Sequence, residues 1–266
     1  MAFRRENNRS TRRVKNNIFV AVSTLGLALG AGGLSLTMAG SASAATLTTL
    51  PAPSGQGGVI DEGPAPATAG VPASKLAALL TLNAQHDSLG SASSIQPAYS
   101  TGFRTLSVVV QQQATSYYCV PASSRVTLSA FISNLPSQGT LASQLGTTSS
   151  GTPMQNVPYV LNLYQSSNYY VLNSATSLAD LQDRIQIDIQ SYSAPLQNAV
   201  EMGLLPWYGG SIVGHHDIAT YGYDYAPKVS NAYVYDPWTD LRAGRQPIST
   251  PDLYNAGAPE YYNLVW

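Results

Sequence analysis

The sequence predicts one α+β domain behind a long N-terminal extension. Apolar residues repeat at helical spacing in the middle of the chain, as at Leu178, Leu181 and Ile185. The C-terminal part is rich in tyrosine and poor in lysine and glutamate, a composition that favours β-sheet. The stretch 95–266, about 170 residues, has the length of one domain with one hydrophobic core.

The first 44 residues have the order of a secretory signal peptide. Residues 1–17 carry six basic residues and one acidic residue, and an uncharged run with an apolar first half begins at Ile18. A small-residue cleavage site, Ala-Ser-Ala, follows at 42–44. We therefore expect a secreted, extracellular protein, exported by the Sec route or, given the Arg-Arg pair at 12–13, by the twin-arginine route. The alternative is an uncleaved anchor, since about 20 apolar residues can span a bilayer.

The chain without its signal peptide is acidic. It keeps seven basic and thirteen acidic side chains, for a formal charge of −6 against −1 for the whole sequence. The sequence has no basic patch, which argues against nucleic acid as a partner. Low charge with many Ser, Thr, Gln, Asn and Tyr residues is typical of a secreted bacterial protein. After signal removal we expect no membrane contact, and we expect a monomer.

Residues 45–94 are predicted to be a low-complexity linker or a pro-segment. The stretch 45–72 is rich in Pro, Gly, Ala and Thr and holds too few large apolar residues for a core. The stretch 73–84 has clustered leucines and predicts a short amphipathic helix. This helix could belong to a pro-segment or could be the first helix of the domain.

The domain is expected to mix helices and strands and to end in a loop-like tail from Ile248. A strand-like run at 106–110 precedes Cys119, and a helix is expected at 122–134, although alternating apolar residues there also suit a strand. Ser177-Leu178-Ala179-Asp180 has the pattern of a capping box and starts a helix that ends at Pro195. Further helices are expected at 140–145 and 155–164, and strands at 196–202, 216–223 and 232–235.

Cys119 is the only cysteine in the chain, so it cannot form an internal disulfide. Pro121 follows two residues later, and proline suits the first turn of a helix because its missing N–H has no partner there. The sulfur is therefore expected at a helix N-terminus, where the positive end of the helix dipole favours a thiolate. The alternative is a small, buried and inert side chain.

A nucleophilic cysteine needs a base and donors for the oxyanion, and the sequence offers both. His216 begins a strand-like run and is the candidate base, and Asp236 ends the next run and could orient the imidazole. Gln113, six residues before Cys119, could donate to the oxyanion together with the Cys119 backbone N–H. The neighbouring Gln112 is an alternative donor.

Two aromatic residues are candidates for substrate binding, Tyr118 beside the cysteine and Trp207 in a turn-rich loop. No metal or other cofactor is expected. His215, His216 and Asp217 are adjacent, but consecutive strand residues point to opposite faces, and no second cluster in the sequence supplies the missing ligands. Asp217 is expected at the surface or in a turn.

Several stretches taken together resemble papain-fold cysteine peptidases of peptidase family thirty-nine: YYCVPASS, the glutamine six before the cysteine, PSQGTLASQL, GHHDIATYGYD and VYDPW. The resemblance covers residues 95–240 and is closer to the secreted single-domain relatives of the double-glycine leader peptidases. It implies a papain-like two-lobed fold, with the cysteine on a helical lobe and the histidine and aspartate on an antiparallel sheet lobe. It also implies peptide-bond hydrolysis without a cofactor.

The family's pattern bears on the choice of histidine and on position 120. Its histidine lies six residues before a Gly-Tyr pair, here Gly222 and Tyr223, so the resemblance selects His216 and leaves His215 as the alternative. The sequence departs from the family at Val120, where the family has glycine. A β-branched side chain beside the nucleophile is expected to narrow the groove or to disfavour the required backbone geometry.

The predicted function is a secreted cysteine peptidase that acts on an extracellular or cell-wall peptide. Cys119 attacks the carbonyl, His216 transfers the proton, Asp236 orients the histidine and Gln113 polarises the oxyanion. Val120 motivates an alternative, a papain-like binding module whose site has lost its activity. A third hypothesis is an amidase or acyltransferase with the same triad, because the substrate pocket rather than the triad sets the acyl donor and acceptor.

Overall fold

The computed structural model of the protein describes residues 58–60, 63–91, 102–225 and 228–266. These residues belong to one compact unit. The predicted signal peptide lies outside the described residues. Within the described ranges, no helix combines the length and the apolar character needed to cross a membrane.

The described residues form helices and strands in alternation. The α-helices are α1 (Ala73–Ser91), α2 (Cys119–Leu128), α3 (Gln138–Leu145), α4 (Asn156–Tyr164), α5 (Leu178–Gln186) and α6 (Thr250–Gly257). Shorter helical segments are η1 (Ile187–Tyr192), η2 (Met202–Leu204) and η3 (Ala258–Glu260). The strands are β1 (Val59–Ile60), β2 (Gly102–Thr105), β3 (Thr152–Pro153), β4 (Leu172–Ser174), β5 (Leu196–Glu201), β6 (His215–Tyr225), β7 (Val229–Asp236), β8 (Gly244–Ser249) and β9 (Asn263–Val265).

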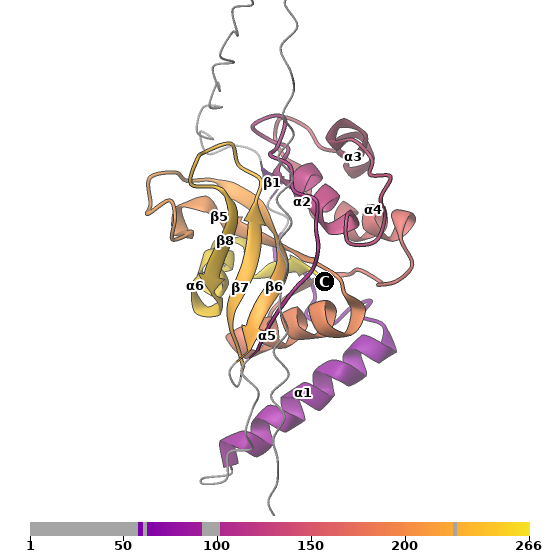
Figure 1. Cartoon of the computed structure of the whole chain (residues 1–266), viewed down its shortest axis with the longest axis vertical. Helices are drawn as coiled ribbons and strands as arrows, with labels where there is room; N and C mark the ends of the chain where they lie inside the picture. The colour runs from indigo at the N-terminus through magenta and orange to yellow at the C-terminus, as the bar shows by residue number, and fades with distance from the viewer. Residues whose placement is uncertain (1–57, 61–62, 92–101, 226–227) are drawn as a thin grey trace, which may run out of the picture. The chain divides into compact units, whose positions relative to one another are not determined.

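The main sheet is antiparallel, with the strand order β4-β9-β5-β6-β7-β8 and with β2 added along β6. Figure 1 shows β6, β7 and β8 of this sheet side by side. The mixed helix and sheet class predicted from the sequence is confirmed. Strand β6 is central, because β5 and β7 flank it, and it is buried over most of its length. It begins beside the C-terminal end of β7, so the residues at these two ends are brought together.

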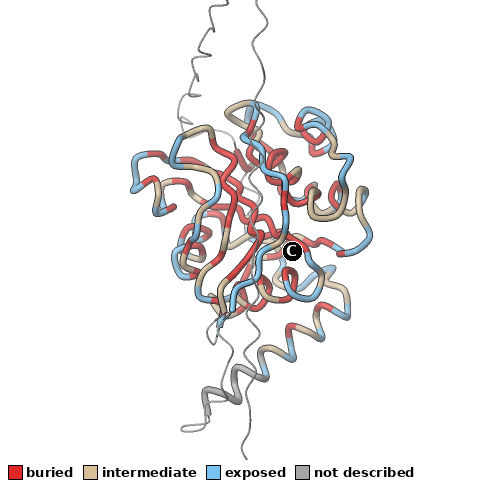
Figure 2. The backbone as a smooth tube through the Cα atoms, in the orientation of Figure 1, coloured by how far each residue is buried: buried red, intermediate tan, exposed pale blue. Residues whose placement is uncertain are grey.

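Among the described residues, three clusters of buried apolar residues join helices to this sheet. The smallest joins α2 to β6 and β7 through Val126, Ala219 and Tyr235, and the other two are larger. One cluster joins β5, β6 and β7 to α5 and α6 and includes Ile185 and Leu253. The other joins α2, α3 and α4 to β5 and β9 and includes Leu128 and Leu161. Figure 2 shows buried residues running through the sheet strands and through α2. The start of α2 is thus held between its own helical cluster and the central strand.

The stretch before and within α1 packs on the domain and is not a free linker. The Asn173 side-chain amide donates to the carbonyl of Pro66 at 2.7 Å. Lys75, in the first turn of α1, is fully buried and forms an ion pair with Asp188 at 2.8 Å. The compact unit therefore begins well before the predicted start at residue 95, because polar and charged contacts anchor this stretch. That residues 45–94 include a pro-segment stays a prediction.

The helix predicted from the Ser177 capping box is confirmed. The Ser177 hydroxyl accepts the Asp180 backbone N–H at 3.1 Å, and the Asp180 carboxylate accepts the Thr176 backbone N–H at 2.8 Å. The expected elements that correspond to α3, α4, β5, β6 and β7 also lie close to their predicted positions. Local signals were sufficient in these segments because capping and periodicity agree with the packing.

Three segments differ from the prediction. The strand expected at 106–110 is absent there: the Val109 N–H donates to the Ser129 hydroxyl at 2.8 Å and the Val108 carbonyl accepts from Arg245 at 3.0 Å, so side chains replace a strand ladder. The helix expected at 122–134 begins earlier and ends at Leu128. The tail from Ile248, expected to be loop-like, forms the end of β8, then α6, η3 and β9.

Candidate active site

Cys119 is the first residue of α2, so its place at a helix N-terminus is as predicted. Tyr118 is the N-cap residue and makes no side-chain capping bond. Helix α2 packs against β6, where the Ser123 hydroxyl donates to the backbone carbonyl of Asp217 at 3.0 Å. This packing places the cysteine beside the start of β6, the strand that carries His216.

The Cys119 thiol is enclosed in this structure, with only 1% of the residue exposed. Burial raises the pKa of the thiol well above its ordinary value, and the nearby carboxyl of Asp217 raises it further. The backbone N–H groups of Asp217 and Val120 lower the pKa, but by less. The helix dipole that the sequence analysis relied on is outweighed, because burial removes the water that would solvate a thiolate.

His216 and Asp236 form a buried pair in which Nε2 lies 2.8 Å from Oδ1. Antiparallel pairing of β6 with β7 explains the contact, since His216 lies near the start of β6 and Asp236 ends β7. The ring of Trp238 packs edge-on against the imidazole, with 6.3 Å between centroids. With Nε2 held by the carboxylate, Nδ1 is the ring nitrogen that can exchange a proton with another group.

Four donors converge on the Asp236 carboxylate. Oδ1 accepts from His216 and from the Trp238 backbone N–H at 2.9 Å. Oδ2 accepts from the Trp207 indole at 2.9 Å and from the Tyr208 hydroxyl at 2.8 Å. Burial alone would raise the pKa of Asp236, but attraction to His216 and these hydrogen bonds outweigh burial and hold the pKa below its ordinary value. Asp236 is therefore suited to stay ionised and to stabilise an imidazolium.

The two predicted substrate contacts have defined surroundings. Trp207 is half-buried and its indole N–H is engaged by Asp236, so it supports the carboxylate. Tyr118 is half-buried and its ring lies edge-on to that of Tyr117, 5.2 Å between centroids. Their roles toward a substrate stay predictions. The sequence analysis missed Tyr208, whose only signal is its place beside Trp207.

Gln113 lies in the loop that leads into α2, and it is 3% exposed. Its backbone N–H donates to the carbonyl of Pro237 at 2.8 Å, which ties it to the residue after Asp236. Its side-chain Nε2 donates to the carbonyl of Thr115 at 2.7 Å, which engages one of the two amide hydrogens within the loop. The loop therefore connects the end of β7 to the N-terminus of α2.

Gln138 fixes this loop from the start of α3, a role that the sequence analysis missed. Its side-chain oxygen accepts the Ala114 N–H at 2.9 Å, and its side-chain nitrogen donates to the Gln112 carbonyl at 2.8 Å. The side chain is 5% exposed. Its signal in the sequence was the stretch PSQGTLASQL, which carried part of the family resemblance without an assigned role for the glutamine.

Comparison with protein families matches residues 105–256 to the Peptidase_C39 like family. The match covers more than half of the chain and includes Gln113, Cys119, His216 and Asp236. The chain belongs to the peptidase C39-like family. The family predicted from the sequence motifs is therefore confirmed.

Several chains of solved structures are similar to this chain. A crystal structure described as that of a C39-like peptidase from Bacillus anthracis is 14% identical, with a TM-score of 0.46, and the match covers 62% of this chain and 96% of that chain. A search of curated proteins found no match.

In this member of the C39-like family, Val120 is a buried apolar residue next to Cys119. Its side chain is fully buried and belongs to the same apolar cluster as Leu145 and Met154. It lies within the first turn of α2, where a valine is compatible with helical backbone. The expectation that Val120 disturbs the backbone is wrong, because α2 is regular helix at this position. That Val120 narrows the groove stays a prediction.

The expectation that Asp217 lies at the surface or in a turn is also wrong. Asp217 is fully buried, and within the described ranges neither carboxyl oxygen has a hydrogen-bond partner. Burial raises the pKa of this carboxyl well above its ordinary value. The physical reason is its place on β6, a central strand covered on both faces, so that the residue following His216 cannot reach water.

Asp217→Asn is expected to stabilise the fold at neutral pH and to have little effect in acid. The unfolded carboxyl ionises near a pKa of about 3.9, whereas the raised pKa keeps the folded carboxyl protonated to higher pH. Below the unfolded pKa of about 3.9, the Asp217 carboxyl is protonated in both states and the wild-type protein keeps its full stability. This stability is lost progressively as the pH rises from there toward the raised folded pKa. The advantage of the variant should grow by about 1.4 kcal/mol for each pH unit in this interval.

Thermal or urea unfolding in acid and at neutral pH measures this effect. A stability difference between Asp217→Asn and wild type that is equal at both pH values would contradict the buried, protonated state of Asp217.

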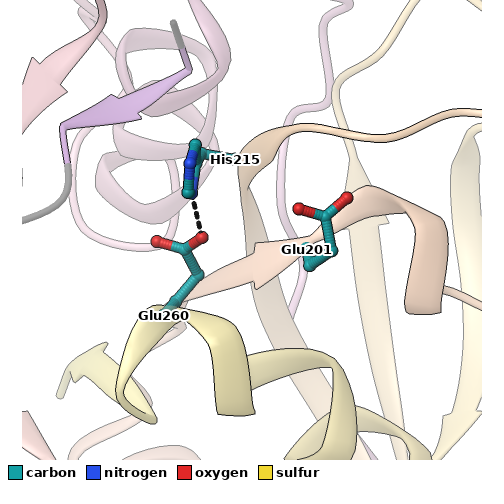
Figure 3. Close-up of side chains that lie close together, drawn as sticks. All are labelled: Glu201, His215 and Glu260. Carbon is teal, nitrogen blue, oxygen red and sulfur yellow. Dashed lines mark hydrogen bonds and ion pairs between the residues drawn. The ribbon is translucent and has the colours of Figure 1, made fainter. Parts of the chain in front are cut away.

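A second group of ligand-type side chains meets near the start of β6. Glu201, His215 and Glu260 come from β5, β6 and η3, and their ligand atoms lie within 4.8 Å of one another (Figure 3). One histidine and two carboxylates form a ligand set that zinc accepts. The sequence analysis expected no such partners for His215, because strand pairing and the C-terminal η3 supply them from distant positions.

Hydrogen bonds within the chain already hold these side chains. His215 Nδ1 is hydrogen-bonded to Glu260, as the dashed line in Figure 3 marks. Glu201 Oε1 accepts the backbone N–H groups of Gly203 at 3.1 Å and Gly214 at 2.6 Å. These bonds account for the arrangement without an ion, and the expectation of a site without a metal stays a prediction.

Proposed function

We propose that this C39-like protein is a secreted cysteine peptidase in which Cys119, His216 and Asp236 form the catalytic triad. The observation that carries the proposal is the buried His216–Asp236 pair, in which Nε2 and Oδ1 are 2.8 Å apart and the carboxylate is held by further donors. This pair lies on the strands against which the helix that begins with Cys119 is packed. The histidine retains Nδ1 for proton transfer.

The proposed reaction uses these groups in sequence. The Cys119 thiol gives its proton to His216 Nδ1, and the sulfur forms a bond to the peptide carbonyl carbon. His216 returns the proton to the amide nitrogen as the C–N bond breaks, which leaves a thioester and a free amine. Water then attacks the thioester with His216 as base, releasing a carboxylic acid and the thiol. Asp236 stabilises the imidazolium in both halves.

The papain-like arrangement of two lobes belongs to this proposal. Cys119 is grouped with the apolar cluster of α2, α3 and α4, whereas Ile218, next but one to His216, belongs to the cluster of the sheet with α5 and α6. A division along these two clusters would put the nucleophile and its base on opposite walls of a cleft. The oxyanion would lie near the Cys119 backbone N–H and the Gln113 side chain.

Gln113→Ala is expected to lower kcat by about 10²-fold, because removing one oxyanion donor has an effect of that order. Gln112→Ala is the matched control: Gln112 is exposed, and the loop uses its backbone carbonyl, which alanine keeps. Initial rates of peptide hydrolysis at saturating substrate measure both variants. If Gln112→Ala causes the larger loss, the oxyanion role belongs to Gln112.

Space for a peptide lies beside β1, although none of the proposed catalytic residues lines it. A cavity of about 570 Å³ borders β1 and helix α4, lined by apolar and polar side chains that include Val59, Tyr159 and Glu260. We propose an extracellular or cell-wall peptide as substrate, with Tyr118 and Trp207 near the cleft, and no role for nucleic acid or a membrane. The acidic charge of the mature chain argues against nucleic acid as a partner.

Product analysis tests the proposed reaction. The purified protein is incubated with a mixed peptide pool, with and without an added primary amine, and the products are identified by mass spectrometry; Cys119→Ala gives the background. New free carboxyl termini that require Cys119 support a peptidase. Amide adducts that require Cys119 would assign the same triad to an acyltransferase instead.

The burial of Cys119 favours a second candidate function, a peptide-binding module that does not cleave. In that case peptides would bind without new termini, even in a variant whose thiol is freely alkylated. Gly58→Ala is the variant in which the thiol is expected to be accessible, so peptide binding and cleavage are compared there.

A further inference from the structure

The N-terminal strand β1 lies directly on the candidate nucleophile. A Cβ atom placed on Gly58 would lie 2.8 Å from the Cys119 sulfur and 2.3 Å from the backbone carbonyl oxygen of His215. Carbon atoms in proteins do not approach a carbonyl oxygen or a sulfur so closely without displacement of one partner. The Gly58 backbone is therefore wedged between the sulfur and the first residue of β6, in a space that admits only glycine.

Main-chain pairing holds this segment in place. Strand β1 pairs in parallel with β3, with Val59 opposite Thr152 and Ile60 opposite Pro153. The Thr152 N–H donates to the Gly58 carbonyl at 3.2 Å. Addition of an extended segment along a short strand is a general mode of peptide binding, in which the main chain gives affinity and pockets for alternate side chains give selectivity.

The side chain after the glycine fills an apolar pocket. Val59 is 4% exposed and belongs to the same buried cluster as Cys119, Leu145 and Met154. Together with the pairing along β3, the burial of Val59 stabilises β1 on the site relative to a position in solvent.

We infer that Gly58–Ile60 occupies the peptide-binding surface of its own chain, formed by the edge of β3, the Cys119 sulfur and the Val59 pocket, and closes the site to substrate. The inference rests on the proposed function only in taking Cys119 as the nucleophile. A peptide that reaches Cys119 must first displace β1, because the two would use the same edge of β3.

The segment is placed as a blocker and not as a bound substrate. The Gly58 carbonyl is engaged by the Thr152 N–H. The Gln113 amide donates to Thr115. The Gly58 carbonyl is thus polarised by β3, and the Gln113 amide is engaged within its own loop. Burial raises the pKa of the Cys119 thiol, so less of the reactive thiolate is present, as expected for a closed site.

Gly58→Ala tests the inference, with Gly139→Ala as the matched glycine control. A Cβ at Gly139 would meet only Ser137 Oγ at 3.8 Å, an ordinary contact, and this residue is exposed on α3. The readout is the rate of alkylation by iodoacetamide, which reports on one site because Cys119 is the only cysteine. We expect Gly58→Ala to raise the rate at least about 10-fold and Gly139→Ala to leave it unchanged.

Circular dichroism and the unfolding midpoint confirm that each variant is folded before alkylation is compared. If Gly58→Ala does not fold, Val59→Asp serves instead, since a carboxylate in the Val59 pocket is expelled by its desolvation cost. An unchanged alkylation rate in a folded variant of either kind overturns the inference.

Hydrolysis measured on the same variants separates this inference from the proposed function. Faster alkylation with no hydrolysis in any variant would keep the closing role of β1 and reject the peptidase. Hydrolysis by wild type that Gly58→Ala does not increase, with alkylation also unchanged, would keep the peptidase and reject the closing role. Faster alkylation together with faster hydrolysis supports both.

Discussion

Replacing Cys119 with alanine is expected to lower peptide hydrolysis by about 10⁴-fold or more, which leaves only background. The sulfur is the atom that would form the thioester, and no other cysteine can replace it. The variant should fold, because the side chain is small and buried, and its loss leaves a space of one atom inside a cluster of larger residues. Rates on a fluorogenic peptide, with the unfolding midpoint as a check on the fold, measure this prediction.

His216→Ala and the double variant Cys119→Ala/His216→Ala provide the control. If the two residues act as one unit, each single variant and the double variant should lose activity to a similar extent, since groups in one catalytic unit are not additive. Full activity in Cys119→Ala would show that the nucleophile is elsewhere. Losses that multiply in the double variant would show that His216 acts independently of Cys119.

Lys75→Met is expected to lower the free energy of unfolding by about 3–5 kcal/mol, the cost of leaving one partner of a buried ion pair without the other. Lys75 is fully buried, with Nζ 2.8 Å from Asp188 and 4.9 Å from the ring centroid of Trp266. Burial raises the pKa of Asp188 even beside Lys75. Without the lysine, Asp188 must protonate or remain as an unpaired buried charge. Urea unfolding at neutral pH measures the change.

The double variant Lys75→Met/Asp188→Asn is the matched control, because it removes both charges. It should recover part of the lost stability, as neutral groups of similar shape replace a buried pair at low cost. A single variant as stable as wild type would mean that α1 is not anchored through Lys75. A large loss of stability would mean that any proteolytic cleavage within residues 45–94 falls before Lys75, because the domain needs that side chain.

The sequence was most informative where a local pattern and the packing agree. The Ser177 capping box, the strand that ends at Asp236 and the position of Cys119 at the start of α2 follow from neighbouring residues alone. The pairing of His216 with Asp236 was predicted because both lie at strand ends. Antiparallel pairing of β6 with β7 makes those ends meet.

The remaining features depend on contacts between distant segments. Asp217 could not be recognised as buried, because its burial follows from the central place of β6 and not from its neighbours in sequence. The valines at 108–110 have strand propensity, but the Arg245 side chain binds the Val108 carbonyl and the Ser129 hydroxyl binds the Val109 N–H, in place of a neighbouring strand. Gly58 has no local signal, because its role depends on where β3 passes.

Strands β1 and β6 have different numbers of neighbouring strands, so we expect them to separate from the domain at different rates. Strand β6 has neighbours on both sides, so amide hydrogens at its centre should exchange with solvent only through large-scale unfolding. Strand β1 pairs over two residues with β3, so it should detach in a local fluctuation of much lower free energy. Deuterium uptake should therefore be fast at Val59 and slow at Ile218. The thiol would become accessible while the histidine and aspartate stay in register.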